Sequence, residues 1–303
     1  MDSGEIINAL GSSGIVGEII DRFFPYCKLT KRALDVYIAE IEKSDKPKEY
    51  KAWEVLRAKQ EFRKLKNINS IVELAQEYCT DEEIDNSSYS DNEAWYDRFF
   101  EKAGSVSEES VQRIWGQILA REIKSKGKTP LTVITILSEI DSELAKRFSL
   151  LCEHRVYTIA LDEMDSCIDS TLSNTVLYLG DNIEYYRNKG LDLLTLNEME
   201  SIGLISTNPF GYSRTYYGAN RVLISDGIFT DCIELKDTKL PFGTVVLTKA
   251  GIYLSDIISP SIVSDQHEVI QEFYSTRGYN IYKSSKAIRV LANGRVQVIN
   301  VKT

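Results

Sequence analysis

The sequence has few residues of the kinds that build metal and disulfide sites. Its 303 residues include two histidines and five cysteines, and the cysteines are widely spaced without a CxxC pair. A zinc knuckle or a dithiol redox centre needs closely spaced ligands of these types. We therefore expect no metal, no cofactor, and reduced thiols in a cytoplasmic protein. The cysteines are Cys27, Cys79, Cys152, Cys167 and Cys232.

The short motifs of common enzyme classes are also missing. The chain has no P-loop, no G-x-S-x-G, no H-E-x-x-H and no protein-kinase set. Cys152 and His154 are neighbours two positions apart, and such residues point to different sides of a helix end. Asp162, Glu163 and Asp165 lie together, but their segment lacks the glycine and final glutamate of an EF-hand loop. We predict no catalytic residue, while an enzyme site assembled from distant residues stays open.

Long apolar runs are absent as well. No run approaches the roughly 20 residues that span a bilayer, and the N-terminus carries acids where a signal peptide has lysines. The net charge of −9 disfavours non-specific binding to nucleic-acid phosphates. The segment from Ile15 to Phe24 is amphipathic. We expect it to dock on the protein's own core, with contact to a membrane surface or a partner helix as the alternative.

What the sequence does contain includes a strong helix signal between Ser105 and Lys124. Ser107 is the expected N-cap, and apolar residues follow at helical spacing while Glu122 falls on the opposite, solvated side. The segment just before it repeats the pattern, with Gly104 as its stop. We predict a helical hairpin with a buried aromatic cluster, formed by Trp95, Phe99, Phe100, Trp115, Ile118 and Leu119.

Long charged helices are predicted before this hairpin, from Leu29 to Tyr78, with a break at Pro47. The part from Lys51 to Lys66 is basic, whereas Glu77 to Asp97 is acidic. Apolar residues recur along one face of the basic helix, so we predict that it mediates self-association or binds a protein partner. Packing of this face on the segment that starts at Ile15 is the alternative. The candidate interaction residues are Trp53, Leu56, Lys59, Phe62, Arg63 and Leu65.

The chain after residue 153 turns to short strands and helices. One helix ends at Gly203 before a short strand. Earlier in the chain, Leu131 to Leu137 is interpreted as a helix. Asn293-Gly294 stands between two alternating apolar runs, which predicts a type I′ β-hairpin. The fold class is therefore α+β, mostly α. The predicted segments are 1–88, 89–153 and 154–303.

Two stretches together resemble an uncharacterised bacterial family of unknown function. They are "AWYDRFFEKAGSVSEESVQRIWGQILAREI" and "LTLNEMESIGLIS" with the later "VVLTKAGIYLSDI". The resemblance covers most of Ile68 to Ile257, and its central part is similar to abortive-infection-type phage-defence proteins. Family members continue with Ser-x-Arg-Thr-Leu where this chain has "TPLTVITIL", so that arginine is absent here. The leading expectation is a non-enzymatic interaction or assembly protein of such a defence system.

The second stretch also resembles a winged-helix module. In those modules a recognition helix precedes Gly-Leu-Ile, and Leu-Thr-x-x-Gly opens the closing helix. The expected recognition helix, "LDLLTLNEMES", carries acids but no Lys or Arg, and a helix that reads the major groove needs donors. We therefore expect a winged-helix-like fold without DNA readout. A DNA-binding transcription regulator that uses Arg214 and Arg221 near the wing is the alternative.

Overall fold

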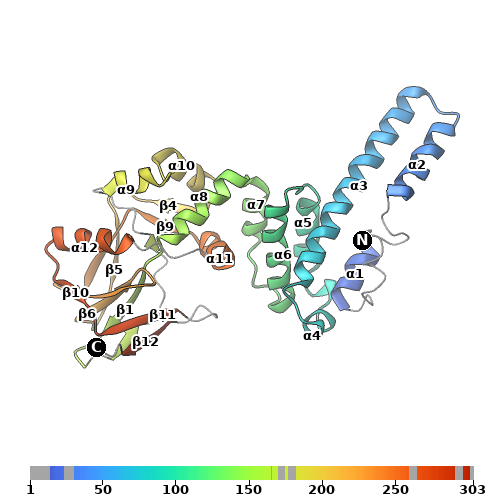
Figure 1. Cartoon of the computed structure of the whole chain (residues 1–303). Coiled ribbons are helices and arrows are strands. Elements are labelled where there is room, and N and C mark those ends of the chain that lie inside the picture. Colours follow the sequence, from blue (N-terminus) through green and yellow to red (C-terminus); the bar gives the residue numbers. More distant parts are fainter. Residues whose placement is uncertain are drawn as a thin grey trace. The chain divides into compact units, whose positions relative to one another are not determined.

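The computed structural model describes residues 14–23, 31–164, 166–169, 175–176, 182–258, 265–290 and 296–300. The chain divides into two compact units, Met1–Glu139 and Ile140–Thr303. Figure 1 shows that the described part of the first unit is helical and that the strands lie in the second. The fold is thus α+β and mostly α, which confirms the predicted class.

The first unit is built from helices joined by short connections. The break at Pro47 is where α3 begins, since a proline suits the start of a helix and not its interior. The predicted helix from Leu131 to Leu137 is confirmed. The elements are α1 (Gly14–Phe23), α2 (Lys31–Lys43), α3 (Lys48–Gln76), α4 (Asp81–Asp85), the 3-10 helix η1 (Tyr89–Asn92), α5 (Glu93–Ala103), α6 (Glu109–Lys124) and α7 (Leu131–Glu139).

The core of this unit is aromatic. The rings of Trp95 and Phe99 stack with centroids 5.0 Å apart, and Phe99 contacts Trp115 at the same distance. All six residues of the predicted cluster are buried. The most extensive partner of α6 is nevertheless α3, and not α5 as a simple hairpin would have it. Gly116 permits this approach, because a Cβ atom there would lie 2.8 Å from the Leu74 Cβ.

The division into units differs from the predicted segments. Residues 1–88 and 89–153 were expected to separate, but α3 contributes to the same core as α5 and α6. Its buried residues begin at Asn67 and continue through Ile68, Ile71, Val72 and Ala75. The second unit begins at Ile140, so it includes α8. Helical spacing indicates which residues share a face, but it does not say which other element covers that face.

The second unit is built around an antiparallel five-stranded sheet in the order β10-β7-β6-β1-β2. A three-stranded sheet, β3-β9-β4, and the pairs β5-β8 and β11-β12 complete it. The elements are α8 (Ser142–Glu153), β1 (Tyr157–Leu161), β2 (Cys167–Asp169), β3 (Thr175–Val176), α9 (Ile183–Asn188), α10 (Leu193–Ser201), β4 (Ile205–Thr207), β5 (Tyr212–Thr215), β6 (Arg221–Ser225), β7 (Thr230–Glu234), β8 (Lys239–Phe242), β9 (Val245–Leu247), α11 (Lys249–Ile258), α12 (Gln266–Thr276), β10 (Ile281–Lys283), β11 (Lys286–Val290) and β12 (Val296–Asn300).

Alternate residues of the large sheet enter two different cores. Val222 and Ile224 of β6 pack in one cluster with Phe273 of α12, whereas Leu223 between them packs in another with Ile288 of β11. This is the period of two that a strand imposes on its side chains. The central strands are therefore covered on both faces.

The two strands predicted for the C-terminal hairpin are present. β11 and β12 pair antiparallel, and the register runs from Lys286 opposite Asn300 to Val290 opposite Val296. The predicted turn at Asn293-Gly294 lies outside the described residues. The antiparallel pairing of β11 with β12 confirms the two strands of the predicted hairpin.

Candidate functional site

The "LTKAG" stretch serves packing within the second unit. Thr248 Oγ1 donates to the Gly203 carbonyl at 2.6 Å, and the Thr248 backbone N–H donates to the Leu204 carbonyl at 3.0 Å. A Cβ atom at Gly251 would lie 2.0 Å from that same Leu204 oxygen. The threonine and the glycine thus hold the start of α11 against the start of β4. The motif needs those residue types for a close backbone contact.

The motif on α6 has a similar structural role. Gln112 Nε2 donates to the Val106 carbonyl at 2.8 Å, and Asn67 Nδ2 of α3 donates to the Gly104 carbonyl at 2.9 Å. These bonds tie α3 and α6 to the loop that follows α5. The expectation that Ser107 caps α6 is wrong, because the N-cap is Glu108 and its side chain makes no capping bond. Tertiary bonds to this loop replace a local cap.

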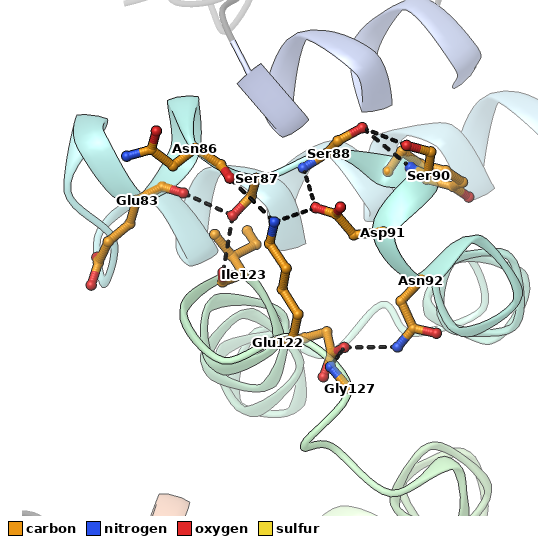
Figure 2. A network of polar contacts seen from close by, with 12 residues as sticks. Glu83, Asn86, Ser87, Ser88, Ser90, Asp91, Asn92, Glu122, Ile123 and Gly127 are labelled. Carbon is orange, nitrogen blue, oxygen red and sulfur yellow. Dashed lines mark hydrogen bonds and ion pairs between the residues drawn. The ribbon is translucent and has the colours of Figure 1, made fainter.

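Glu122 is buried, so its predicted place on a solvated face is wrong. Its Oε1 accepts hydrogen bonds from Asn92 Nδ2 at 2.8 Å and from the Gly127 N–H at 2.6 Å, and its Oε2 accepts one from the Thr129 N–H at 3.1 Å. Figure 2 shows Asn92 and Gly127 converging on this carboxylate. A buried carboxylate needs such donors. They come from the loop after α6 and from η1, which no helical period reveals.

A polar seam surrounds this carboxylate (Figure 2). Lys126 pairs with Asp91 and donates to the Asn86 carbonyl at 3.2 Å. The backbone N–H of Ser88 donates to Asp91 at 2.8 Å, and the Ser87 hydroxyl lies within hydrogen-bond distance of two carbonyl groups. Each of these groups caps a helix or closes a loop. The seam joins residues 83–92 to the end of α6.

The helix α1 is seated beside this seam. Its residues Ile15, Val16 and Ile19 are buried, as expected for docking on the protein's own core. The Glu18 carboxylate accepts from the Ser88 hydroxyl and the Tyr89 N–H.

At the other end of α1, Arg22 pairs with Glu93 at 3.1 Å and Asp97 at 3.0 Å and lies over the Tyr89 ring. A surface hollow of about 300 Å³ remains between these groups. Among its lining charges, Arg22 is paired with Glu93, and Glu18 is held by the Ser88 hydroxyl and the Tyr89 N–H. The hollow therefore offers no free charge or activated nucleophile for a substrate.

The helix α2 and the first half of α3 form a second candidate site, which we call the arm (residues 31–66). The two helices run side by side (Figure 1), and no side chain between residues 31 and 66 is buried. Trp53 is 72% exposed and Leu56 is 47% exposed. Val36, Tyr37 and Tyr50 are exposed too. The arm thus presents large apolar side chains on both of its helices.

The predicted interaction residues do not all share this exposure. Lys59 and Arg63 are exposed with Trp53 and Leu56, whereas Phe62 and Leu65 are partly buried. The arm is therefore more exposed at its far end than near the core.

Part of the acidic run from Glu77 to Asp97 is engaged in ion pairs within the first unit. Glu93 and Asp97 pair with Arg22, and Asp91 pairs with Lys126. Glu83 lies 3.6 Å from Lys124. Four of the acids between residues 77 and 97 thus help to assemble the first unit. Their charges are only partly available to a basic partner.

The second unit offers no thiol nucleophile at Cys152. The residue is buried, and burial raises the pKa of its thiol, whereas a nucleophilic cysteine needs a lowered pKa. Asp162 accepts from the backbone N–H groups of Met164 and Ser166, and Glu163 bonds to Asn220. Asp165 lies outside the described residues. Within the described ranges, no cluster of three or more His, Cys, Asp or Glu side chains is arranged for a metal ion.

The helix proposed from the sequence for recognition is α10, and its exposed residues are a mixture of apolar, polar and acidic side chains. Leu193 and Leu194 are exposed, while Thr195, Leu196 and Met199 are buried. The Asp192 carboxylate accepts from the Thr195 N–H at 2.8 Å as the N-cap. The exposed residues of this helix include no cation, in keeping with its sequence.

Arg214 and Arg221 lie on strands of different sheets. Arg214 is in β5, opposite Leu240 of β8, whereas Arg221 is in β6, opposite Glu234 of β7. Neither arginine lies on the three-stranded sheet β3-β9-β4. In the part of the chain that the structure describes, no helix is both long and apolar enough to cross a bilayer.

The fold and these contacts define an α+β protein whose marked sequence motifs serve internal packing. The chain belongs to the family described as "Protein of unknown function (DUF2806)", whose sequence pattern matches residues 55–271. The match begins inside the arm and ends within α12. A search of curated proteins gave no match, and a search of solved structures gave none either.

Proposed function

We propose that this chain is a non-enzymatic interaction protein that self-associates through the arm, with a second copy of the chain as the partner. One observation carries the proposal. The arm extends over residues 31–66 without a buried side chain, yet it exposes a tryptophan, a leucine and two tyrosines. Helices of this length obtain most of their stability from tertiary packing. A second arm would supply that packing.

The apolar residues provide the larger part of the expected association energy. Full burial of one large apolar side chain contributes about 1.5–3 kcal/mol, and roughly half of that remains to be gained at positions such as Trp53 and Leu56. Five such side chains on each of two arms exceed the lower end of the association cost of about 4–15 kcal/mol. Surface ion pairs contribute only about 0–1 kcal/mol each. Arm pairing thus depends on apolar contact.

The charges of the arm are compatible with pairing between two copies. Residues 31–66 contain eleven Lys and Arg and seven Asp and Glu, interspersed along both helices. Each arm therefore carries both signs, so an antiparallel pair can place unlike charges opposite each other. Two paired arms would form a four-helix bundle, an arrangement with well-known packing rules. The two-fold symmetry makes the contact self-complementary.

The cellular setting of this assembly is part of the proposal. Similarity of the "WYDRFF…VSEESVQRIW" segment to abortive-infection-type proteins supports a role in anti-phage defence in the cytoplasm of a bacterium. The motif residues Gln112 and Trp115 have packing roles. The similarity therefore supports a shared helical scaffold. The surface that we propose for partner binding is the arm.

A DNA-binding regulator is the second candidate function. It is favoured by one observation, the order of elements in which α9 and α10 fall between β3 and β4 and the sheet runs β3-β9-β4, as in winged-helix modules. It is disfavoured by the lack of Lys and Arg on α10 and by the placement of Arg214 and Arg221 outside that sheet. A DNA titration at two salt concentrations tests it, since binding through phosphates must weaken steeply with salt.

Sedimentation velocity of the unmutated protein and two variants tests arm pairing. The unmutated protein should sediment as a dimer at micromolar concentration, and Trp53→Glu should sediment as the 34.4 kDa monomer. Leu194→Glu is the matched control, since it puts the same charge at an apolar position that is 77% exposed in the second unit. The control should remain dimeric. A monomeric unmutated protein, or a Trp53→Glu dimer, would overturn the proposal.

A further inference from the structure

Three elements of the second unit meet at a buried histidine. His154, directly after α8, is fully buried. Its ring contacts the rings of Tyr185 and Tyr186 of α9, with centroids 5.7 and 5.4 Å away. Its backbone carbonyl accepts from Gln266 Nε2 of α12 at 2.7 Å. The residue thus joins α8, α9 and α12 in one place.

A chain of polar atoms leads from this ring to the surface. His154 Nδ1 lies 2.9 Å from the Leu150 carbonyl, and Nε2 lies 3.4 Å from the Tyr185 hydroxyl. That hydroxyl donates to Asp265 Oδ1 at 2.9 Å, and Lys189 Nζ donates to Asp265 Oδ2 at 2.9 Å. Asp265 itself is half exposed. A proton at His154 is therefore two hydrogen bonds from solvent.

When the imidazole is neutral, the hydrogen-bonded path from His154 to Asp265 has one donor hydrogen too few to satisfy every acceptor. Nδ1 faces a carbonyl at hydrogen-bond distance, so it carries the hydrogen, and Nε2 is then an acceptor. The Tyr185 hydroxyl has one hydrogen, and Asp265 at 2.9 Å is a better acceptor than Nε2 at 3.4 Å. Nε2 is left with the tyrosine oxygen and no donor. A second proton on the ring would satisfy this contact but would place a charge in a buried site.

The charged groups around the ring decide between these effects. Burial lowers the pKa of His154, and the nearby Lys189 lowers it as well, against the raising effects of the Leu150 bond, Asp265 and Glu153. Asp265 is already bound to Lys189 and Tyr185, and those bonds keep its pKa low despite partial burial. The positive charge of Lys189 therefore offsets much of the stabilisation that the negative charge of Asp265 would give to a protonated His154. The cost of burying the charged ring exceeds the gain from one long hydrogen bond.

We propose that His154, Tyr185 and Asp265 form a proton-responsive clasp, which holds α8, α9 and α12 together while His154 is neutral and opens when His154 takes up a proton. Opening exposes the imidazole to water, where its charge is solvated. It also releases Gln266 at the start of α12 from the His154 carbonyl. The sign follows from linkage, because the closed state binds fewer protons than the open state. The clasp is therefore fully closed above about pH 6.5 and weakens below it.

Hydrogen exchange of the full chain at two pH values tests the clasp. Protection factors of α9 and of the first turn of α12, corrected for the intrinsic pH dependence of exchange, should fall about tenfold between about pH 7.5 and about pH 5.5. His154→Gln should abolish this pH dependence. His267→Gln should retain it, and it is the matched control because the chain has only two histidines. A pH-independent unmutated protein, or a His154→Gln variant that keeps the tenfold change, overturns the proposal.

Histidine proton resonances provide a second measurement if His154→Gln does not fold. The unmutated protein should show two imidazole signals, and His267→Gln assigns the remaining one to His154. That signal should titrate below the ordinary histidine range in the closed protein. Tyr185→Phe should weaken the protection of α12 at both pH values, since it removes the link to Asp265. A His154 signal that titrates at or above about pH 6.5 contradicts the clasp.

Discussion

The two halves of α3 belong to one continuous helix but have different surroundings. From Asn67 onward the helix contributes buried residues to the core of the first unit, whereas between Lys48 and Lys66 it contributes none. The arm half is rich in good helix formers, whereas the core half begins with asparagine, serine and β-branched residues, yet both are helical. The difference shows that helical pattern and burial are separate properties. The core half packs against α5 and α6, whereas the arm half runs beside α2 and buries no side chain among the residues that the structure describes.

The largest effect is expected where the core is densest. Trp115→Ala removes a fully buried side chain that touches Phe99, and it should lower the free energy of unfolding by about 3–5 kcal/mol. Urea denaturation of the first unit, followed by far-UV circular dichroism, measures the change. An unchanged midpoint would show that Trp115 does not pack as a core residue and would make it a candidate for binding.

A smaller loss is expected from the buried carboxylate on the far end of α6. Glu122→Gln keeps the shape of the side chain but turns one amide N–H₂ toward the N–H donors of Gly127 or Thr129. We expect a loss of about 2 kcal/mol, because hydrogen bonds to a charged acceptor become neutral and one donor is left unpaired. Thermal unfolding measures it. A loss below that of an exposed control, Glu109→Gln, would contradict the role of this carboxylate.

The arm half should respond to helix propensity alone. Ala52 is exposed near the start of α3, and Ala52→Gly should cost about 1 kcal/mol of local helix stability. Hydrogen exchange should detect it as faster exchange in residues 48–60 with no change in α6. Faster exchange across α6 would mean that the arm and the core unfold as one unit, which would remove the distinction between the halves.

The smallest effect on stability is expected at Trp53. Trp53→Ala should change the free energy of unfolding of the monomer by less than about 0.5 kcal/mol, as is usual for exposed positions. Comparison with Trp115→Ala in α6 thus separates the exposed arm from the core of the first unit. Acrylamide quenching gives an independent check, since the chain has three tryptophans. Fluorescence lost in Trp53→Ala should be the readily quenched fraction, and its protection at high protein concentration would indicate arm pairing.

Several structural features were predictable because they depend on neighbours in sequence. Pro47 ends one helix and starts another, since proline fixes φ and lacks an N–H. Gly104 follows the last residue of α5 as expected. The alternating residues of β11 and β12 predicted their pairing. In each case the chemistry of a few adjacent residues determines the local backbone.

Other features were missed because their partners are distant in sequence. Ser107 had the residue type of a cap, but the loop it occupies is held by Asn67 and Gln112 instead. The helical spacing placed Glu122 on the solvated face of α6, but Asn92 and the loop after α6 cover its carboxylate. The link between His154 and Asp265 joins elements more than a hundred residues apart. No spacing rule relates such positions.

The sequence by itself determined the helices of the first unit, the helix start at Pro47, the paired strands at the C-terminal end and the α+β class. Tertiary structure alone decided which apolar faces are covered. The spacing that placed Trp115 in a core also placed Trp53 on an apolar face, yet Trp115 is fully buried against Phe99 of another helix, whereas Trp53 is 72% exposed. The physical reason is that a side chain's periodicity depends on its own backbone, whereas its burial depends on which other surface reaches it.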